Sequence, residues 1–154
     1  RVRVRSPTLA AMMLTLLKVN RGDRVLELKT ASGYQTALLA HMGAKVYSLE
    51  TDRSLGRVMS PTLNGLGFAD LHYEVGGDTY AGLPAQGPYD RIIATAAYPT
   101  PPIALFKQLK PGGRMIAPVG DVATGQKLML YLKTPDGEMR QKDLLPVAFG
   151  MMPR

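Results

Sequence analysis

The segment from residue 24 to residue 39 constrains the fold more than any other part of the sequence. It begins with an apolar strand pattern, Arg24–Leu28, and continues through a short turn of small residues into a helix pattern. In α/β proteins this order presents backbone N–H groups and a helix N-terminus to a nucleotide-like ligand. A glycine fingerprint would place Gly at alternate turn positions, which here are Lys29, Ala31 and Gly33. The sequence therefore predicts a nucleotide-binding turn that keeps one of its three glycines.

Strand and helix patterns alternate along the rest of the 154 residues. A helix is expected to open at Pro7, after Ser6 as its N-cap, and to bury Leu9, Met12, Met13, Leu16 and Leu17. The further expected helices are 34–42, 53–66 and 103–109. The expected strands are 24–28, 45–50, 71–75, 89–97, 114–119, 127–133 and 138–147. The pattern predicts a single α/β domain over 1–154, with a mostly parallel, Rossmann-like sheet and an antiparallel hairpin added at one edge.

Three local patterns give expectations of their own. Pro61 lies inside a helix pattern, where proline costs about 3 kcal/mol, so a break is expected near Ser60. Lys110–Gly113 predicts a tight turn before the strand that starts at Arg114. Basic and apolar residues alternate over Arg1–Arg5, which indicates an extended basic arm or a charged edge strand.

Composition excludes several classes of protein. The chain has no cysteine, so disulfides and cysteine zinc sites are excluded, and a cytoplasmic location is expected. No apolar run approaches the roughly 20 residues of a membrane span. The two histidines, His41 and His72, have no partner at a spacing typical of nucleophilic catalysis, and no metal-ligand cluster is evident. A net charge of +7 leaves nucleic-acid binding open, but the charges are scattered, which favours an ordinary basic surface.

Candidate ligand-binding residues follow three of the expected strands. They are the turn Lys29–Gln35, the acidic strand end Glu50, and Gly77-Asp78-Thr79. Ligands of open α/β sheets bind beyond the carboxyl ends of the strands, where a carboxylate can accept hydrogen bonds from ribose hydroxyls. The alternative interpretation is that Glu50 and Asp78 are acids that cap loops.

Longer stretches resemble the protein-L-isoaspartate (D-aspartate) O-methyltransferase family. Two of them, Ser32-Gly33-Tyr34-Gln35 and Thr95-Ala96-Ala97, are specific to that family, and the similarity runs from about Pro7 to the C-terminus. The turn Lys110-Pro111-Gly112-Gly113 is shared by many methyltransferases. The resemblance implies a seven-stranded S-adenosylmethionine methyltransferase sheet and methyl transfer to L-isoaspartyl carboxylates in damaged proteins.

The resemblance also implies a set of cofactor-binding residues. The methionine part would contact Glu27, Lys29, Thr30, Ala31, Ser32, Gly33, Tyr34 and Gln35. The ribose would contact Glu50 and Thr51, and the adenine would contact Gly77, Asp78 and Thr79. The family implies no metal, and it points to no catalytic acid or base, because the nucleophile is already an anion and positioning carries the rate.

Two departures from the family pattern bear on activity. Lys29 and Ala31 replace glycines, and a lysine cation about 4 Å from a sulfonium repels it by about 1 kcal/mol in bulk water and about 4 kcal/mol at an effective dielectric of 20. Lys29 is expected either to turn away or to pair with the cofactor's carboxylate. Arg1–Arg5 replaces a stretch that helps form the family's substrate site, and whether a longer parent chain supplies the family's N-terminal part stays open.

These departures put S-adenosylmethionine binding in question and keep two other functions in view. One is a catalytically degenerate methyltransferase-like domain that serves as a binding module. The other is an RNA-directed methyltransferase, for which the basic charge is the argument.

Overall fold

The computed structural model describes residues 6–154, and the expectation for Arg1–Arg5 lies outside the described residues. Seven strands form one sheet in the order β3-β2-β1-β4-β5-β6-β7. They are β1 (Arg24–Leu28), β2 (Lys45–Glu50), β3 (Leu71–Val75), β4 (Tyr89–Ala94), β5 (Leu109–Asp121), β6 (Gly125–Lys133) and β7 (Met139–Val147). The helices are α1 (Pro7–Leu17), α2 (Tyr34–His41), α3 (Arg53–Gly65), the 3-10 turn η1 (Pro84–Gln86) and α4 (Ile103–Phe106).

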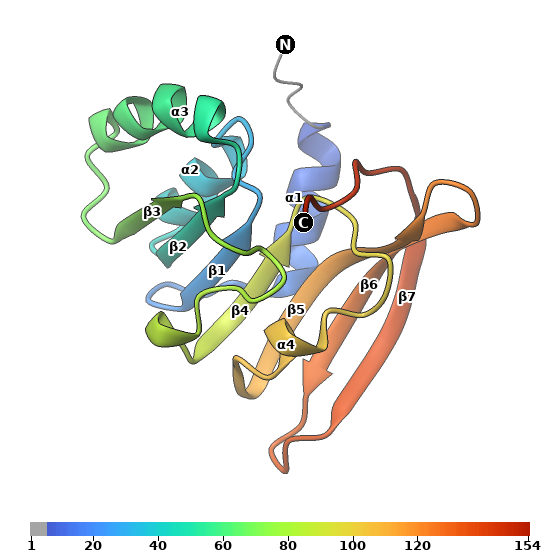
Figure 1. The fold of residues 1–154 in the computed structure, drawn as a ribbon. Helices are drawn as coiled ribbons and strands as arrows, with labels where there is room; N and C mark the ends of the chain where they lie inside the picture. Colours follow the sequence, from blue (N-terminus) through green and yellow to red (C-terminus); the bar gives the residue numbers. More distant parts are fainter. Residues whose placement is uncertain (1–5) are drawn as a thin grey trace.

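The first five strands are parallel, and β6 runs antiparallel to its neighbours β5 and β7 at one edge (Figure 1). Strand order reverses between β1 and β4, which are direct neighbours. This confirms the expected Rossmann-like sheet with a C-terminal hairpin. The carboxyl ends of β1, β2 and β4 therefore meet at one edge, where α/β sheets bind their ligands.

Each face of the sheet has its own apolar core. On one face, α1 buries Met13, Leu14 and Leu17 against inward-facing strand residues such as Val25 and Ile93. Leu9, Met12 and Leu16 pack at the edge of this core, so the expected apolar face of α1 is confirmed. On the other face, Leu83, Leu105, Phe106 and Met152 cover the strands. α4 therefore lies on the opposite face of the sheet from α1 (Figure 1).

The helix α3 is continuous, so the expected break near Ser60 is wrong. Pro61 lies inside the helix but is exposed, and so is Arg57, whose carbonyl loses its usual donor. Water can satisfy that carbonyl, which lowers the cost of the missing N–H. The helix is also fixed at its start, since Asp52 accepts hydrogen bonds from the N–H groups of Ser54 (2.8 Å) and Leu55 (3.2 Å).

The fourth helix is shorter than expected and β5 is longer. α4 ends at Phe106, and β5 begins at Leu109, before the expected turn at Lys110–Gly113. Those residues form an irregularity inside the strand, because Tyr89 pairs with Leu109 while Arg91 pairs with Arg114. The expected tight turn is therefore present, with Gly112 at φ +79°, but parallel pairing with β4 begins before it, at Leu109, so the turn lies within β5 instead of preceding the strand.

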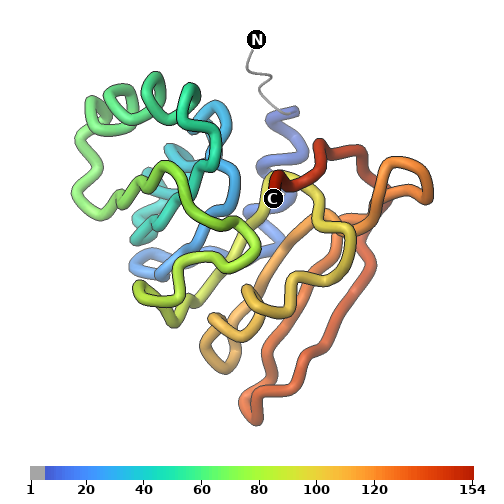
Figure 2. The backbone as a smooth tube through the Cα atoms, viewed as in Figure 1, coloured from blue at the N-terminus to red at the C-terminus, as the bar shows by residue number. Residues whose placement is uncertain are grey.

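The C-terminal segment after β7 returns across the carboxyl edge of the sheet. Figure 2 shows this segment, in dark red, running beside the end of β4. Met151 pairs with Ala97, the Ala97 N–H donates to the Gly150 carbonyl (2.8 Å), and the Met152 N–H donates to the Ala97 carbonyl (2.7 Å). The last residues of the chain therefore help to shape the edge where a ligand is expected.

Candidate functional site

The loop between β1 and α2 has a left-handed backbone at each of the three alternate positions. The φ angle is +71° at Lys29, +51° at Ala31 and +71° at Gly33. Glycine adopts such angles at no steric cost, whereas each other L-residue in this conformation is destabilised by about 1–2 kcal/mol. A Cβ at Gly33 would also lie 2.8 Å from Met59 Cε, so this position has no room for a side chain without a shift. The loop thus keeps the backbone of a glycine turn, although two of its three residues are not glycine.

Glu50, the last residue of β2, binds this loop through its carboxylate. Its side chain is fully buried. Oε1 accepts hydrogen bonds from Lys29 Nζ (2.5 Å) and from the Asp52 N–H (2.9 Å), and Oε2 accepts from the Ala31 N–H (2.9 Å). Lys29 therefore points its charge at Glu50, and its side chain is 20% exposed. The Lys29 ion pair and the Ala31 N–H bond therefore tie two of the left-handed positions to Glu50, and the Asp52 N–H fixes the same carboxylate from the start of α3.

Glu27 lies in the interior of β1 and is also fully buried. Its Oε2 accepts hydrogen bonds from Thr36 Oγ1 and Ser48 Oγ, both at 2.6 Å. Oε1 has no hydrogen-bond partner within residues 6–154. Burial is the largest cause that raises the pKa of Glu27, to about 7, although both hydroxyls oppose the shift. Glu27 is thus a buried carboxyl that ties β1, β2 and α2 together below the loop.

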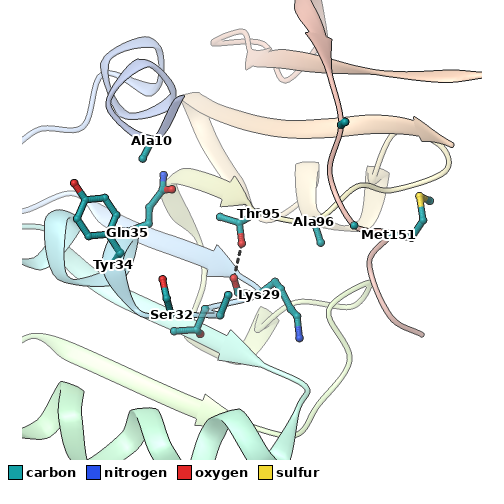
Figure 3. A pocket seen from close by; sticks show the side chains of 12 residues that line it. Ala10, Lys29, Ser32, Tyr34, Gln35, Thr95, Ala96 and Met151 are labelled. Atoms are coloured by element: carbon teal, nitrogen blue, oxygen red, sulfur yellow. Dashed lines mark hydrogen bonds between the residues drawn. The ribbon is translucent and has the colours of Figure 1, made fainter. Parts of the chain in front are cut away.

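A cavity of about 440 Å³ opens above the loop, within the size range of small-molecule sites (Figure 3). Four parts of the chain form its wall: α1, the loop with the start of α2, the residues after β4, and the C-terminal segment. The lining residues are Ala10, Lys29, Thr30, Ala31, Ser32, Tyr34, Gln35, Thr95, Ala96, Ala148, Gly150 and Met151.

Gln35, which lines this cavity, has a buried hydrogen-bond donor without a partner in the described part of the chain. The residue is 7% exposed, and its Nε2 has no partner within residues 6–154. Figure 3 shows its amide on the cavity wall, between Ala10 and Thr95 in this view. An unsatisfied buried donor costs about 1–3 kcal/mol, so the cavity favours a ligand with an acceptor at this point.

Thr95 fixes the other side of the loop. It follows β4, and its hydroxyl donates a hydrogen bond to the Lys29 carbonyl (Figure 3). The Thr95 N–H also donates to the Leu28 carbonyl (3.1 Å). The loop is therefore held by the ends of β2 and β4 together.

Not every predicted site residue lies on this cavity. Among the described residues, Glu27, Gly33, Glu50, Thr51, Gly77, Asp78 and Thr79 do not line it. Asp78 is exposed, and its Oδ1 accepts a hydrogen bond from the Tyr80 N–H (2.8 Å). Thr79 is buried, and its hydroxyl donates to the Pro153 carbonyl (3.3 Å). The structure brings together six of the eight predicted residues of the methionine part and leaves those of the nucleoside part outside the cavity.

Some lining residues were absent from the predicted set. Thr95 and Ala96 directly follow the buried strand β4, and this position at the carboxyl end of a parallel strand is one from which a place in the ligand site could have been predicted. Ala148, Gly150 and Met151 carry no such signal, because only the pairing of Met151 with Ala97 brings them to the site. Ala10 comes from the first turns of α1, which its sequence marks only as core.

Residues 6–154 contain neither a candidate metal site nor a helix suited to cross a membrane. Within residues 6–154, no cluster of three histidine or acidic side chains is arranged to hold a metal ion. None of the helices in that part is both long enough and apolar enough to span a bilayer.

Comparison with known sequences gives a consistent family. A model of the protein-L-isoaspartate(D-aspartate) O-methyltransferase family matches residues 1–152. The chain is 42% identical over 146 residues to protein-L-isoaspartate O-methyltransferase 1 of Nitrosospira multiformis, which covers 95% of this chain and 61% of that protein. It is 42% identical over 147 residues to the enzyme of that name from Anaeromyxobacter dehalogenans, covering 95% of this chain and 70% of the relative.

Solved structures agree with the sequence comparison. A protein-L-isoaspartate O-methyltransferase structure matches with a TM-score of 0.88 and 28% identity, over 96% of this chain and 47% of that one. A protein of Plasmodium falciparum described as such a methyltransferase in complex with S-adenosyl-L-homocysteine matches with a TM-score of 0.84 and 20% identity, over 97% of this chain and 75% of that one. The chain therefore spans about half to three quarters of the proteins that it resembles.

Proposed function

The chain belongs to the protein-L-isoaspartate(D-aspartate) O-methyltransferase family, and from this premise we propose that it transfers a methyl group from S-adenosylmethionine to L-isoaspartyl carboxylates of damaged proteins. The observation that carries the proposal is the backbone of the loop at Lys29, Ala31 and Gly33. All three residues keep the left-handed φ of a glycine turn, and this conformation is strained at Lys29 and Ala31, which are not glycine. Strained backbone that the surroundings hold in place is typical of functional sites.

The residues around the loop fit the cofactor in part. The cavity and the orphaned Gln35 amide suit the polar methionine part, which carries carboxylate oxygens as acceptors. Glu50 stands at the strand end where a carboxylate meets ribose hydroxyls. In this structure, however, Lys29 covers Glu50. The methionine half of the site is open, and the nucleoside half is closed.

The proposed reaction asks little acid–base chemistry of the protein. S-adenosylmethionine, when bound, supplies a methyl group on a positively charged sulfur that leaves as a neutral thioether. A substrate carboxyl with a pKa near 4 is ionised at neutral pH and needs no general base. The role of the protein is to orient the nucleophile and to exclude water. Such positioning lowers the activation free energy by several kcal/mol when the carboxylate oxygen is held close to the methyl group.

The C-terminal segment is the part of the chain suited to orient the substrate. The backbone of Gly150 and Met151 forms part of the cavity wall, to which Gln35 also belongs. A substrate peptide bound along this backbone would lie beside the methionine part of the cofactor.

The test is a methyl-transfer assay with a matched pair of peptides. One peptide carries an L-isoaspartyl residue, and the other has the same sequence with ordinary L-aspartate. We expect radioactive methyl esters on the first peptide only, and at least tenfold less product with Gln35→Leu. Calorimetry with S-adenosylhomocysteine runs in parallel. If the cofactor product binds and neither peptide is methylated, the proposed activity is wrong while cofactor binding stands.

A further inference from the structure

We propose that Lys29 is an internal competitor for the nucleoside: its ammonium occupies the place on Glu50 that ribose hydroxyls need. The inference rests on the proposed function, because it concerns the same cofactor. It adds a residue that sets cofactor affinity and that works against binding. The observation behind it is the hydrogen-bond pattern of Glu50.

The acceptor sites of Glu50 are nearly full. A carboxylate has about four lone-pair sites, two on each oxygen. Oε1 already accepts from Lys29 Nζ and from the Asp52 N–H, and Oε2 accepts from the Ala31 N–H. One site on Oε2 remains. A ribose diol that engages both oxygens needs one site on each, so one present donor must leave.

Lys29 is the donor that can leave. The N–H groups of Ala31 and Asp52 belong to the backbone on either side of Glu50, and moving them would disrupt the loop and the start of α3. The Lys29 side chain instead has rotatable bonds and is 20% exposed, so water can reach it. A ligand hydroxyl can therefore displace the ammonium without a change in the backbone.

The shape of the cavity agrees with this assignment. Lys29 lines the cavity, whereas Glu50 is fully buried and, among the described residues, is not part of the wall. The cavity thus ends at Lys29, on the side that leads to Glu50. A glycine at position 29 would leave the carboxylate open to the cavity and would relieve the positive φ at the same time.

The size of the effect follows from the fraction of molecules with the pair open. Apparent affinity falls in proportion to the competent fraction. If the pair is closed in nine molecules of ten or more, cofactor affinity is at least about tenfold below that of a chain without the pair. The same factor applies to adenosine, because the competition is for the nucleoside part alone.

The first test is calorimetry on wild type, Lys29→Gly and Lys18→Gly with S-adenosylhomocysteine and with adenosine. Lys18 is the matched control, since it also has a positive φ (+53°) but ends α1, outside the cavity wall. We expect Lys29→Gly to bind both probes at least tenfold more tightly than wild type, and Lys18→Gly to bind as wild type does. Equal or weaker binding by Lys29→Gly overturns the inference and leaves the proposed function in place. Absence of S-adenosylhomocysteine binding in every variant overturns both.

A second measurement uses the wild-type chain and does not depend on the folding of a variant. Lysines are acetylated with a limiting reagent and the products are read by mass spectrometry. Lys29 is expected to react more slowly than Lys127, whose side chain is 62% exposed. Saturating S-adenosylhomocysteine should raise the rate at Lys29 at least threefold, because the displaced ammonium enters solvent. Stronger protection of Lys29 by the probe would mean that the lysine is a ligand contact and would overturn the inference.

Discussion

The interior of β1 and the end of β2 each bury one carboxylate, and the two regions treat it differently. Glu27, in β1, receives two hydroxyl donors on one oxygen and leaves the other oxygen without a partner in the described chain. Glu50, in β2, receives two N–H groups and a lysine cation. Both side chains are fully buried, so exposure does not distinguish them. The difference lies in the donors that contact each carboxyl group: two hydroxyls at Glu27, and two N–H groups and a cation at Glu50.

The comparison separates a structural acid, Glu27, from Glu50, the acid that we propose as a ligand contact and that Lys29 covers. Hydroxyl donors alone do not outweigh burial at Glu27, whose pKa is raised to about 7, so it loses its proton only near neutral pH. At Glu50 the cation and the N–H groups supply the kind of contacts that a ligand would otherwise make. The carboxylate at the end of β2 is therefore satisfied by donors of this chain, as the proposed competition requires, whereas the carboxyl in the interior of β1 belongs to the core.

The largest expected effect comes from removing the cation while leaving Glu50 covered. Lys29→Met keeps the length of the side chain and leaves a buried carboxylate without its charge partner. We expect the free energy of unfolding to fall by about 4 kcal/mol at pH 7, as is typical when one member of a buried pair is lost. Urea unfolding followed by circular dichroism measures the change.

The control for this variant is an exposed ion pair with the same N–O distance. Lys127 Nζ and Asp143 Oδ2 are also 2.5 Å apart, but the side chains are 62% and 54% exposed. Lys127→Met should cost less than about 1 kcal/mol, since exposed pairs contribute little. Equal losses for the two variants would mean that burial of Glu50 does not decide the strength of its pair.

The next largest effect is the pH dependence that Glu27 imparts. Its pKa is about 7 when folded, against 4.5 for the unperturbed group, chiefly because burial disfavours the charged form. Between these values the folded state binds more protons than the unfolded state. The free energy of unfolding therefore decreases as pH rises through this window, by about 3 kcal/mol in total.

Glu27→Gln should flatten this dependence between pH 5 and pH 8, measured by urea unfolding at both values. The Asp52 and Asp90 carboxyls do not interfere, because the pKa of each is lowered. The N–H groups of Leu55 and Ser54 lower the pKa of Asp52, and at Asp90 burial raises the pKa but is outweighed by the Arg24 N–H and by Lys110. If wild type is equally stable at pH 5 and pH 8, Glu27 is ionised throughout and burial does not raise its pKa.

The sequence predicted the sheet well because strands and helices carry periodic apolar patterns. Val25 and Leu26 alternate between the two cores, and the turn after them is marked by small residues. Local strain was predictable as well, since Lys29 and Ala31 stand where a glycine turn requires positive φ. The error at Pro61 has another cause: the Arg57 residue, whose carbonyl loses its donor, is exposed to water, and that exposure follows from tertiary packing and not from the local sequence.

Long-range contacts explain what the sequence did not predict at the site. Lys29 was expected to turn away or to meet the cofactor, and its partner Glu50 lies 21 residues further along the chain. The C-terminal wall depends on the pairing of Met151 with Ala97, which joins the segment after the edge strand β7 to the residues that follow the central strand β4. Neither contact has a periodicity or a motif, so only the folded chain reveals them.

The smallest effect concerns the strain that the end of β2 offsets at Ala31. Its φ is +51° and its N–H donates to Glu50, a bond that Ala31→Gly preserves. Removing the Cβ relieves about 1–2 kcal/mol of strain and adds about 0.5–1 kcal/mol of chain entropy to lose on folding, so we expect a net stabilisation of about 0.5–1 kcal/mol. Lys18→Gly, at φ +53°, should stabilise by a similar amount, because neither change touches the Lys29–Glu50 pair. If Ala31→Gly destabilises the protein while Lys18→Gly stabilises it, the loop needs the restricted backbone of Ala31 to keep Glu50 covered. In that case the loop stabilises the end of β2, and the end of β2 does not stabilise the loop.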